Sequence, residues 1–232
     1  MIKYEQWDSE NFGFKVGSLI PDHNNKITAE YLDAIINTGK KEGYRLLYLK
    51  GVVLDKELTD SKVKLVDEKV IYSQIVQGEH LGDSNVVSIK NCDLSETLLN
   101  LSYESGKYSR YRTDPDMPEF VFTVLYKIWL QNSLNGKIAS DVLSYVINGV
   151  PQSILTYKEK EGLVTIGLIA VNSSVSGSGI GTKMMQTFLS SLPLNTVVEV
   201  ATQKTNKIAC RFYEKNGFTP KSVTNIFHIW IK

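Results

Sequence analysis

The sequence lacks several features that would place it in a special class of protein. Its 232 residues include only two cysteines, Cys92 and Cys210, which lie far apart and match no metal-ligand pattern. No run of 18 apolar residues is present, so the sequence predicts no membrane-spanning helix. Lys and Arg total 26 against 25 for Asp and Glu, a balance that favours neither nucleic acid nor an anionic membrane as a partner. The first residues lack the basic-then-apolar layout of a secretion signal, and a reduced cytoplasmic protein is expected.

The most informative stretch of the chain runs from Gly162 to Gly217. Leu163–Val171 is short, apolar and rich in β-branched residues, which favours a strand. A glycine-containing loop follows, and residues 180–192 then carry apolar side chains at helical spacing up to Pro193. A second apolar run at 196–201 leads to a helix that begins near Thr205 or Asn206 and ends at Asn216-Gly217. The pattern therefore predicts strand, loop, helix, strand and helix.

The glycine loop is the first candidate site. Gly177, Gly179 and Gly181 leave three positions without a Cβ atom, so a ligand can approach the backbone closely. Free N–H groups in the first turn of the following helix suit a pyrophosphate. Thr182 stands where a dinucleotide-binding fingerprint needs its third glycine, and no Gly-Lys-Ser/Thr triplet of a P-loop is present. A flexible linker is the alternative interpretation.

The helix that begins at Asn206 is the second candidate site. Asn206, Ala209 and Tyr213 fall on one helical stripe because Asn206 and Tyr213 are nearly two turns apart. A stripe of this composition indicates a surface that faces ligand or solvent. The alternative is that Tyr213 is a packing residue.

Together these two motifs resemble the GNAT superfamily of CoA-dependent N-acyltransferases, over roughly residues 137–232. The resemblance rests on Ser176-x-x-Gly179-x-Gly181 and on Asn206…Ala209-x-x-Phe212-Tyr213-Glu214-Lys215-Asn216-Gly217-Phe218. The family's loop opens with Arg or Gln, whereas this sequence has Ser176. The resemblance implies a mixed α/β fold whose central, mostly antiparallel sheet is flanked by helices and splayed at the CoA site.

The resemblance also implies a cofactor and a set of residues that bind it. The expected co-substrate is acyl-CoA, either acetyl-CoA or a longer acyl-CoA, with no metal. Tyr213 would protonate the departing thiolate. The residues expected to bind CoA are Ile169, Val171, Gly177, Ser178, Gly179, Ile180, Gly181, Thr182, Asn206 and Ala209.

The part of the chain before this stretch is predicted to form a smaller domain and the first strands of the catalytic one. Residues 1–85 are expected to form an N-terminal α/β domain, with Phe12, Phe14 and Val16 alternating as in a strand. The polar, glycine-containing stretch 78–85 marks a boundary, and residues 86–232 form the GNAT-like domain. Asn148-Gly149 between two apolar runs predicts a hairpin.

Two further segments resemble one branch of the family, the bacterial enzymes that acylate dTDP-linked amino sugars. These segments are Trp7-Asp8-Ser9-Glu10-Asn11-Phe12-Gly13 and Ser109-Arg110-Tyr111-Arg112. In an extended segment Arg110 and Arg112 would face the same way, and paired arginines suit a diphosphate. Tyr108 or Tyr111 could stack on a base or sugar ring. A solvated loop is the alternative.

The group that deprotonates the acceptor amine is not identified by the sequence. His228 lies in a strand-like run and titrates in a useful range, so it is a candidate base or substrate ligand. A core or surface histidine without such a role is the alternative. Asp114 and Asp116 are weaker candidates.

The expected function is direct transfer of an acyl group from acyl-CoA to the amine of a dTDP-linked 3- or 4-amino-dideoxy sugar, as in O-antigen or lipopolysaccharide biosynthesis. The alternatives are an acyltransferase for another small amine and a non-catalytic acyl-CoA-binding module. A small-molecule nucleotide sugar is the expected partner, without nucleic acid or membrane, and a homodimer is compatible with the sequence. The acyl chain, the C3 or C4 position of the amine and the oligomeric state are left open.

Overall fold

The computed structural model of the chain describes residues 1–21, 27–55, 58, 63–78 and 81–231. These residues form two compact units that are interleaved along the chain. The first unit contains Met1–Lys69, Ser109–Val121 and Val223–Lys232, and the second contains Val70–Tyr108 and Phe122–Ser222. The strands β4 (Val63–Ile75) and β11 (Thr219–Trp230) each contribute residues to both units, and so does helix α5 (Glu119–Leu134), most of which lies in the second.

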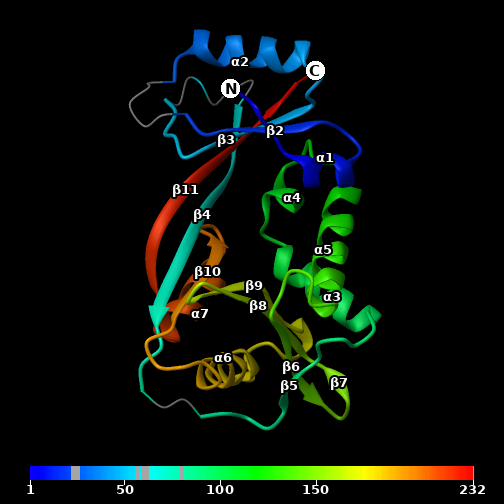
Figure 1. Cartoon of the computed structure of the whole chain (residues 1–232), viewed down its shortest axis with the longest axis vertical. Helices are drawn as coiled ribbons and strands as arrows, with labels where there is room; N and C mark the ends of the chain where they lie inside the picture. The colour runs from blue at the N-terminus through cyan, green and yellow to red at the C-terminus, as the bar shows by residue number, and fades with distance from the viewer. Residues whose placement is uncertain (22–26, 56–57, 59–62, 79–80, 232) are drawn as a thin grey trace. The chain divides into compact units, whose positions relative to one another are not determined.

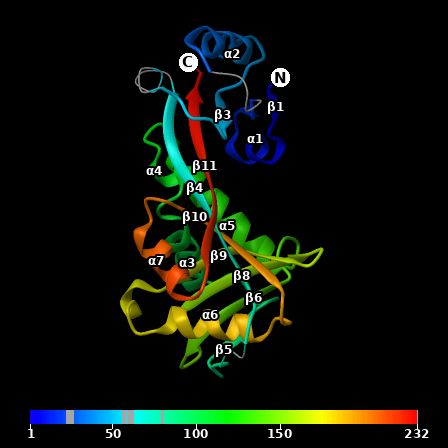
Figure 2. The same ribbon diagram turned by 90° about the vertical axis from the view of Figure 1, so that its left-hand side faces the viewer.

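The first unit is a mixed sheet with helices on both faces. The strand order is β1-β2-β3-β11-β4, in which β2 and β3 are parallel and β11 is antiparallel to β3. One face packs against α2 and the other carries α1, as Figure 2 shows. The remaining elements of this unit are β1 (Lys3–Tyr4), α1 (Gln6–Phe12), β2 (Val16–Leu19), α2 (Ala29–Lys41), β3 (Leu46–Lys50) and α4 (Arg110–Thr113).

The second unit is a mostly antiparallel sheet in the order β4-β10-β9-β8-β6-β5. Only the β10–β9 pair among these registers is parallel. Helix α6 covers one face, and α3 and α5 lie on the other side of β8 and β9 (Figure 1). Its further elements are β5 (Val86–Ser88), α3 (Glu96–Gly106), α5 (Glu119–Leu134), β6 (Asp141–Ile147), β7 (Val150–Pro151), β8 (Ser153–Lys160), β9 (Leu163–Val171), η2 (Ser173–Val175), α6 (Ile180–Ser190), β10 (Val197–Gln203) and α7 (Lys207–Lys215).

Local sequence signals explain why these elements form. The apolar stripe of α6 is buried, with Met184, Met185 and Phe188 inside the core of the second unit. Asn148 and Gly149 both have positive φ, at 50° and 78°, as a type I′ hairpin requires. The predicted mixed α/β fold with a mostly antiparallel sheet is confirmed.

One predicted element near the N-terminus is wrong. Phe12 ends helix α1, and the strand begins only at Val16, so the alternation of Phe12, Phe14 and Val16 does not mark a strand. Gly13 has a φ of 72° and ends the helix in a left-handed cap. The predicted domain boundary at residue 85 falls within the second unit. The division of the chain into domains 1–85 and 86–232 stays a prediction. Residues 79–80 of the predicted boundary lie outside the described residues.

Among the described residues, no helix combines the length and the apolar character needed to cross a bilayer.

Candidate functional site

The glycine loop ends in a row of unused backbone donors at the start of α6. Gly177 and Gly179 both have a φ of 84°, and a Cβ atom added to either would meet nothing within 4 Å. Lys183 N–H is the first amide of the helix to find an acceptor, at Gly179 O. Within the described part of the chain, the amides of residues 179–182 have no backbone acceptor. Four such donors at the positive end of an 11-residue helix are an arrangement that suits an anion.

Gly181 differs from the expectation that its missing side chain leaves room for a ligand, and the neighbouring Ser178 side chain is used within the loop. A Cβ atom at Gly181 would lie 3.2 Å from the Phe212 ring and 3.4 Å from a Val171 methyl, so the missing side chain lets α6 start close to α7 and β9. The Ser178 hydroxyl donates to Val175 O at 2.6 Å and closes the loop on itself. The expectation was therefore wrong about the use of the Gly181 side-chain space, although its N–H group remains a free donor among the described residues.

The strands β9 and β10 separate beside this loop. Their parallel register runs from Leu163 with Val197 to Ile166 with Val200, and both strands then continue without pairing with each other. Ile169 and Val171 pair on their other side with β8, opposite Leu155 and Ser153. The edge of β9 that faces β10 is therefore open from residue 167 onward, which confirms the predicted splay of the sheet.

A β-bulge in β9 lies where the open edge begins. Tyr157 is opposite Ile166 and Leu155 is opposite Ile169, so Gly167 and Leu168 together face the single residue Thr156. The Thr156 hydroxyl accepts a hydrogen bond from the Leu168 amide at 2.8 Å. It thereby satisfies a backbone donor that the bulge would otherwise leave without a partner. Gly167 itself is exposed on the sheet. The only sequence feature that could have indicated this bulge is the glycine inside a strand pattern.

Replacing Thr156 with Val should destabilise the second unit. The variant keeps the shape of the side chain but leaves the buried Leu168 N–H without its acceptor, at a cost of about 1–3 kcal/mol. Urea unfolding measures the loss. Thr156→Ser keeps the hydroxyl and is the matched control, and equal unfolding free energies for the Val and Ser variants would contradict this role of the hydroxyl.

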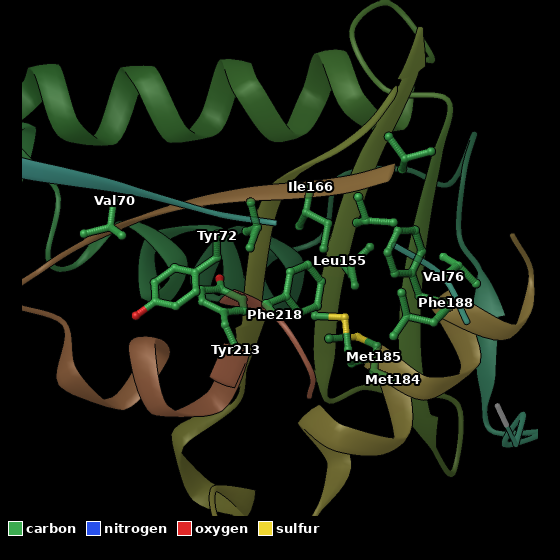
Figure 3. Packing of buried hydrophobic residues seen from close by; sticks show 14 residues of the cluster. Val70, Tyr72, Val76, Leu155, Ile166, Met184, Met185, Phe188, Tyr213 and Phe218 are labelled. Carbon is green, nitrogen blue, oxygen red and sulfur yellow. The ribbon is translucent and has the colours of Figure 1, made fainter. Parts of the chain in front are cut away.

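The side chains of Asn206 and Tyr213 have different environments: Asn206 caps helix α7, and Tyr213 is buried. The Asn206 side chain caps the helix, because its Oδ1 atom accepts from Ala209 N–H at 3.1 Å. Tyr213 is only 2% exposed, and its ring contacts Tyr72 and Phe218 in the core of the second unit. Figure 3 shows these three rings grouped together, with the α6 side chains beyond them. The predicted ligand-facing stripe therefore ends in a largely buried ring.

The hydroxyl of Tyr213 is nevertheless free to interact. It forms no hydrogen bond to the described residues, yet it is not one of the polar atoms that are fully sealed from solvent. Burial raises the pKa of Tyr213 above its ordinary value, with a smaller contribution from Cys210. A protonated phenol whose oxygen retains contact with solvent can donate a proton to a base that forms beside it.

Tyr72 is a neighbour of this phenol that the sequence did not indicate. It projects from β4 in the second unit, and its hydroxyl donates to Glu214 Oε1 at 2.9 Å. Burial raises the pKa of Tyr72 as well. Tyr72 and Glu214 are 142 residues apart in the chain, and no local spacing could have paired them.

The first unit contains a separate buried cluster around His228. The ring of His228 is fully buried, its Nδ1 atom lies 2.6 Å from Asp114 Oδ2, and it stacks on Tyr48 with centroids 5.1 Å apart. Trp230 Nε1 also donates to Asp114 Oδ2 at 2.8 Å. Asp114 therefore fixes the orientation of His228, and the sequence suggested both residues only as separate candidates for the base.

The two arginines do not face the same way, which corrects the expectation of an extended segment. Arg110–Thr113 is a helical turn, α4, in which residues two apart point to opposite sides. Arg110 is turned inward, with its guanidinium 5.0 Å from the Tyr48 ring centroid and Nη2 donating to the Tyr111 hydroxyl. Arg112 lies outside and contacts Glu119 at 3.3 Å. A paired diphosphate clamp of Arg110 and Arg112 is therefore not formed.

The His228 cluster predicts a pH dependence of stability. Burial lowers the pKa of His228 to about 4, although the Asp114 hydrogen bond opposes the shift and Arg110 adds to it. In the unfolded chain the pKa is about 6.5, so between these values the unfolded state binds more protons. The unfolding free energy should therefore fall as the pH drops from about 6.5 to 4, by at most about 3 kcal/mol.

A comparison with His228→Asn isolates this contribution. Lys50 and Arg110 keep their charges across the window, the pKa of Asp114 is lowered by its hydrogen bonds despite burial, and burial raises that of Asp8. These groups remain in both proteins, so the difference between the two unfolding curves reports His228. Parallel pH profiles for the two proteins would contradict the shifted pKa.

The described residues contain no group of three or more His, Cys, Asp or Glu side chains placed to hold a metal ion.

The chain matches known proteins in sequence and in fold. A family model described as the acetyltransferase (GNAT) family matches residues 99–218, just over half of the chain. The spore coat polysaccharide biosynthesis protein SpsD of Bacillus subtilis is 26% identical over 138 residues, which cover 59% of this chain and 47% of that protein. The chain thus spans about half the length of this relative.

Two solved structures share the fold. A functionally unknown conserved protein from Staphylococcus epidermidis has a TM-score of 0.64 at 12% identity, over 94% of this chain and 85% of the other. A GCN5-related N-acetyltransferase from Sphaerobacter thermophilus has a TM-score of 0.56, also at 12% identity, over 94% and 73% of the two chains.

Proposed function

Because the chain belongs to the acetyltransferase (GNAT) family, we propose that it transfers an acyl group from acyl-CoA to the amine of a dTDP-linked 3- or 4-amino-dideoxy sugar. The family uses acyl-CoA, so the donor class follows from membership. The observation that carries the proposal is the row of free amides at residues 179–182 beside the open edge of β9. The identity of the acceptor as an amino sugar does not follow from family membership and is proposed separately.

The second unit fits the donor. The amides of residues 179–182 would hold the CoA pyrophosphate, and the left-handed glycines 177 and 179 leave the approach to them clear. The open edge of β9 would pair with the amide groups of the pantetheine arm through Ile169 and Val171. Ser176 replaces the Arg or Gln of the family loop, so backbone N–H groups would make most of the hydrogen bonds to the phosphates. Asn206 and Ala209 would border this arm at the start of α7.

The reaction would be a direct transfer. The acceptor amine would attack the thioester carbonyl, forming a C–N bond while the C–S bond breaks. Backbone N–H groups of β9 near Val171 would polarise the carbonyl oxygen. Tyr213 would donate its phenol proton to the departing thiolate. The raised pKa of Tyr213 keeps this proton on the phenol at neutral pH. The amine would lose its own proton to a base that is not assigned.

A nucleotide sugar is the acceptor that the remaining observations favour. The similarity to a spore coat polysaccharide biosynthesis protein points to carbohydrate chemistry. Arg110, Tyr111 and His228 form a polar cluster in the first unit, and Arg112 lies on the outer side of the same turn. These four residues are proposed to contact the acceptor. A role in polysaccharide biosynthesis and a cytoplasmic location are parts of the same proposal.

The proposal is tested by following release of the CoA thiol. The purified chain is incubated with acetyl-CoA and dTDP-4-amino-4,6-dideoxygalactose, and dTDP-glucose, which has no amine, is the control. Thiol release with the amino sugar and none with the control is the expected result. Thiol release with spermine but not with the amino sugar would show that the acceptor is a polyamine and not a nucleotide sugar. Binding of CoA without release for any amine would contradict catalysis.

A further inference from the structure

Helix α7 carries a row of exposed cations along one side. Lys207, Arg211 and Lys215 are spaced four residues apart, so they follow one another on the same face of the helix. All three residues are exposed, and within the described ranges of the chain none of them takes part in an ion pair. Lys204, shortly before the helix, is exposed as well. We call Lys207, Arg211 and Lys215 the cationic stripe.

The cationic stripe opposes the stability of its own helix. Like charges four residues apart repel each other, and Lys207 places a cation in the first turn, at the positive end of the helix dipole. No acidic residue lies in that turn, and the carboxylate of Glu214 already accepts from the Tyr72 hydroxyl. Only Lys215, in the last turn, suits the dipole. Helix stability therefore does not explain the stripe, and an anionic partner would relieve its repulsion.

The stripe lies next to the site proposed for the acyl donor. Helix α7 follows β10, the strand that separates from β9 at the open edge. The Phe212 ring lies 3.2 Å from the position of a Cβ atom at Gly181, so one side of α7 faces the head of α6. Ile208 is one turn before Phe212, hence on that same side, and it is 73% exposed. A protein docked on the stripe would find an apolar contact at Ile208 and the donor site beside it.

These features favour an acidic protein that presents its acyl group on a pantetheine arm. Acyl groups are carried as pantetheine thioesters by CoA and by acyl carrier proteins, which are acidic and hold the arm through a single phosphate on a serine. A stripe of one sign with an apolar neighbour complements such a surface. Nucleic acid is a poorer match, because its binding surfaces combine cations with exposed aromatic rings, and both aromatic residues of α7 are at least partly buried.

We propose that α7 is the docking surface for an acyl carrier protein, which serves as a second acyl donor beside acyl-CoA. The phosphate of its arm would meet the amides at the head of α6, and the arm would follow the open edge of β9. The acceptor amine forms the C–N bond as the C–S bond of the carrier's thioester breaks. Tyr213 gives its proton to the carrier's sulfur, which leaves as a thiol, and the amine loses its proton to the same unassigned base. The inference rests on the proposed acyltransferase function.

A comparison of two donors tests the docking surface. Acetyl-CoA or an acetylated acyl carrier protein is supplied with dTDP-4-amino-4,6-dideoxygalactose, and thiol release is followed. Lys207→Glu/Arg211→Glu should lower kcat/KM for the acetylated carrier by about tenfold or more and leave that for acetyl-CoA within about twofold. The variant should fold, because a negative charge at position 207 suits the helix dipole and one at position 211 can pair with Lys215.

Lys158→Glu/Lys160→Glu is the matched control. Both lysines are exposed on β8 in the same unit, and their reversal changes the net charge of the chain by the same amount. This control should use both donors as the wild type does. Added salt should lower kcat/KM for the carrier more than for acetyl-CoA, because it screens contacts between charged surfaces. Equal losses with the carrier in the two double variants would overturn the docking surface, since net charge and not α7 would then set the rate.

The outcomes separate this inference from the proposed function. A wild-type chain that uses acetyl-CoA but not the acetylated carrier would overturn the docking surface and leave the acyltransferase proposal intact. Equal losses with both donors in Lys207→Glu/Arg211→Glu would overturn it too, and would assign the stripe to the nucleotide half of CoA. Tighter binding of single-stranded RNA than of the carrier, measured by fluorescence anisotropy, would make nucleic acid the partner. Thiol release from neither donor with any amine would overturn the proposed function itself.

Discussion

Tyr213→Phe should lower the turnover number by about 100-fold or more while leaving the affinity for acyl-CoA nearly unchanged. The variant removes only the hydroxyl, and that hydroxyl has no hydrogen bond to the described residues, so neither packing nor folding should suffer. The loss would fall on the step in which the thiolate leaves, because no other group would supply its proton. Steady-state rates and equilibrium binding of acetyl-CoA, measured on the same preparation, separate the two effects.

Tyr72→Phe is the matched control for this experiment. It also removes one phenol hydroxyl from the same cluster, but that hydroxyl is bound to Glu214. We expect a modest loss of stability and a turnover close to that of the wild type. If Tyr213→Phe turned over normally, Tyr213 would be a packing residue. If Tyr72→Phe instead lost activity, the proton donor would be on β4.

Gly179→Ala should weaken acyl-CoA binding at least tenfold. At a φ of 84° an added Cβ atom is strained by about 1–2 kcal/mol and projects into the open space beside the free amides. Both effects disturb the positions from which four N–H groups would grip the pyrophosphate. Calorimetric titration with CoA measures the change, and thermal unfolding reports the accompanying loss of stability.

Gly162→Ala separates strain from binding. Gly162 has a φ of 79° and also has nothing within 4 Å of an added Cβ atom, but it lies in the turn between β8 and β9. Its alanine variant should lose a similar amount of stability and bind CoA as the wild type does. Equal CoA affinity for the two variants would show that residue 179 does not border the donor site.

Local sequence patterns predicted the elements that build the donor site. The apolar stripe of α6, the cap at Asn206 and the hairpin at Asn148-Gly149 each depend on residues within a few positions of one another. The separation of β9 from β10 was predicted only through family resemblance, because no residue spacing marks the point at which two strands stop pairing.

Contacts between distant parts of the chain could not be predicted in the same way. Asp114 and His228 are 114 residues apart, and their pairing follows from the place of β11 in the sheet of the first unit. Arg110 and Arg112 were misinterpreted because four residues of helix give almost no periodic signal. At Gly181 the sequence could not distinguish a glycine that admits a ligand from one that admits a neighbouring helix.

The central claim, that backbone amides at the head of α6 hold the pyrophosphate of CoA, is tested most directly by amide NMR. CoA and pantetheine, which lacks the phosphates, are titrated into the same nitrogen-labelled sample. The account predicts large shifts of the amide resonances of Gly179, Ile180, Gly181 and Thr182 with CoA and small ones with pantetheine. Resonances of these four amides that stay in place while CoA binds elsewhere on the chain would contradict it.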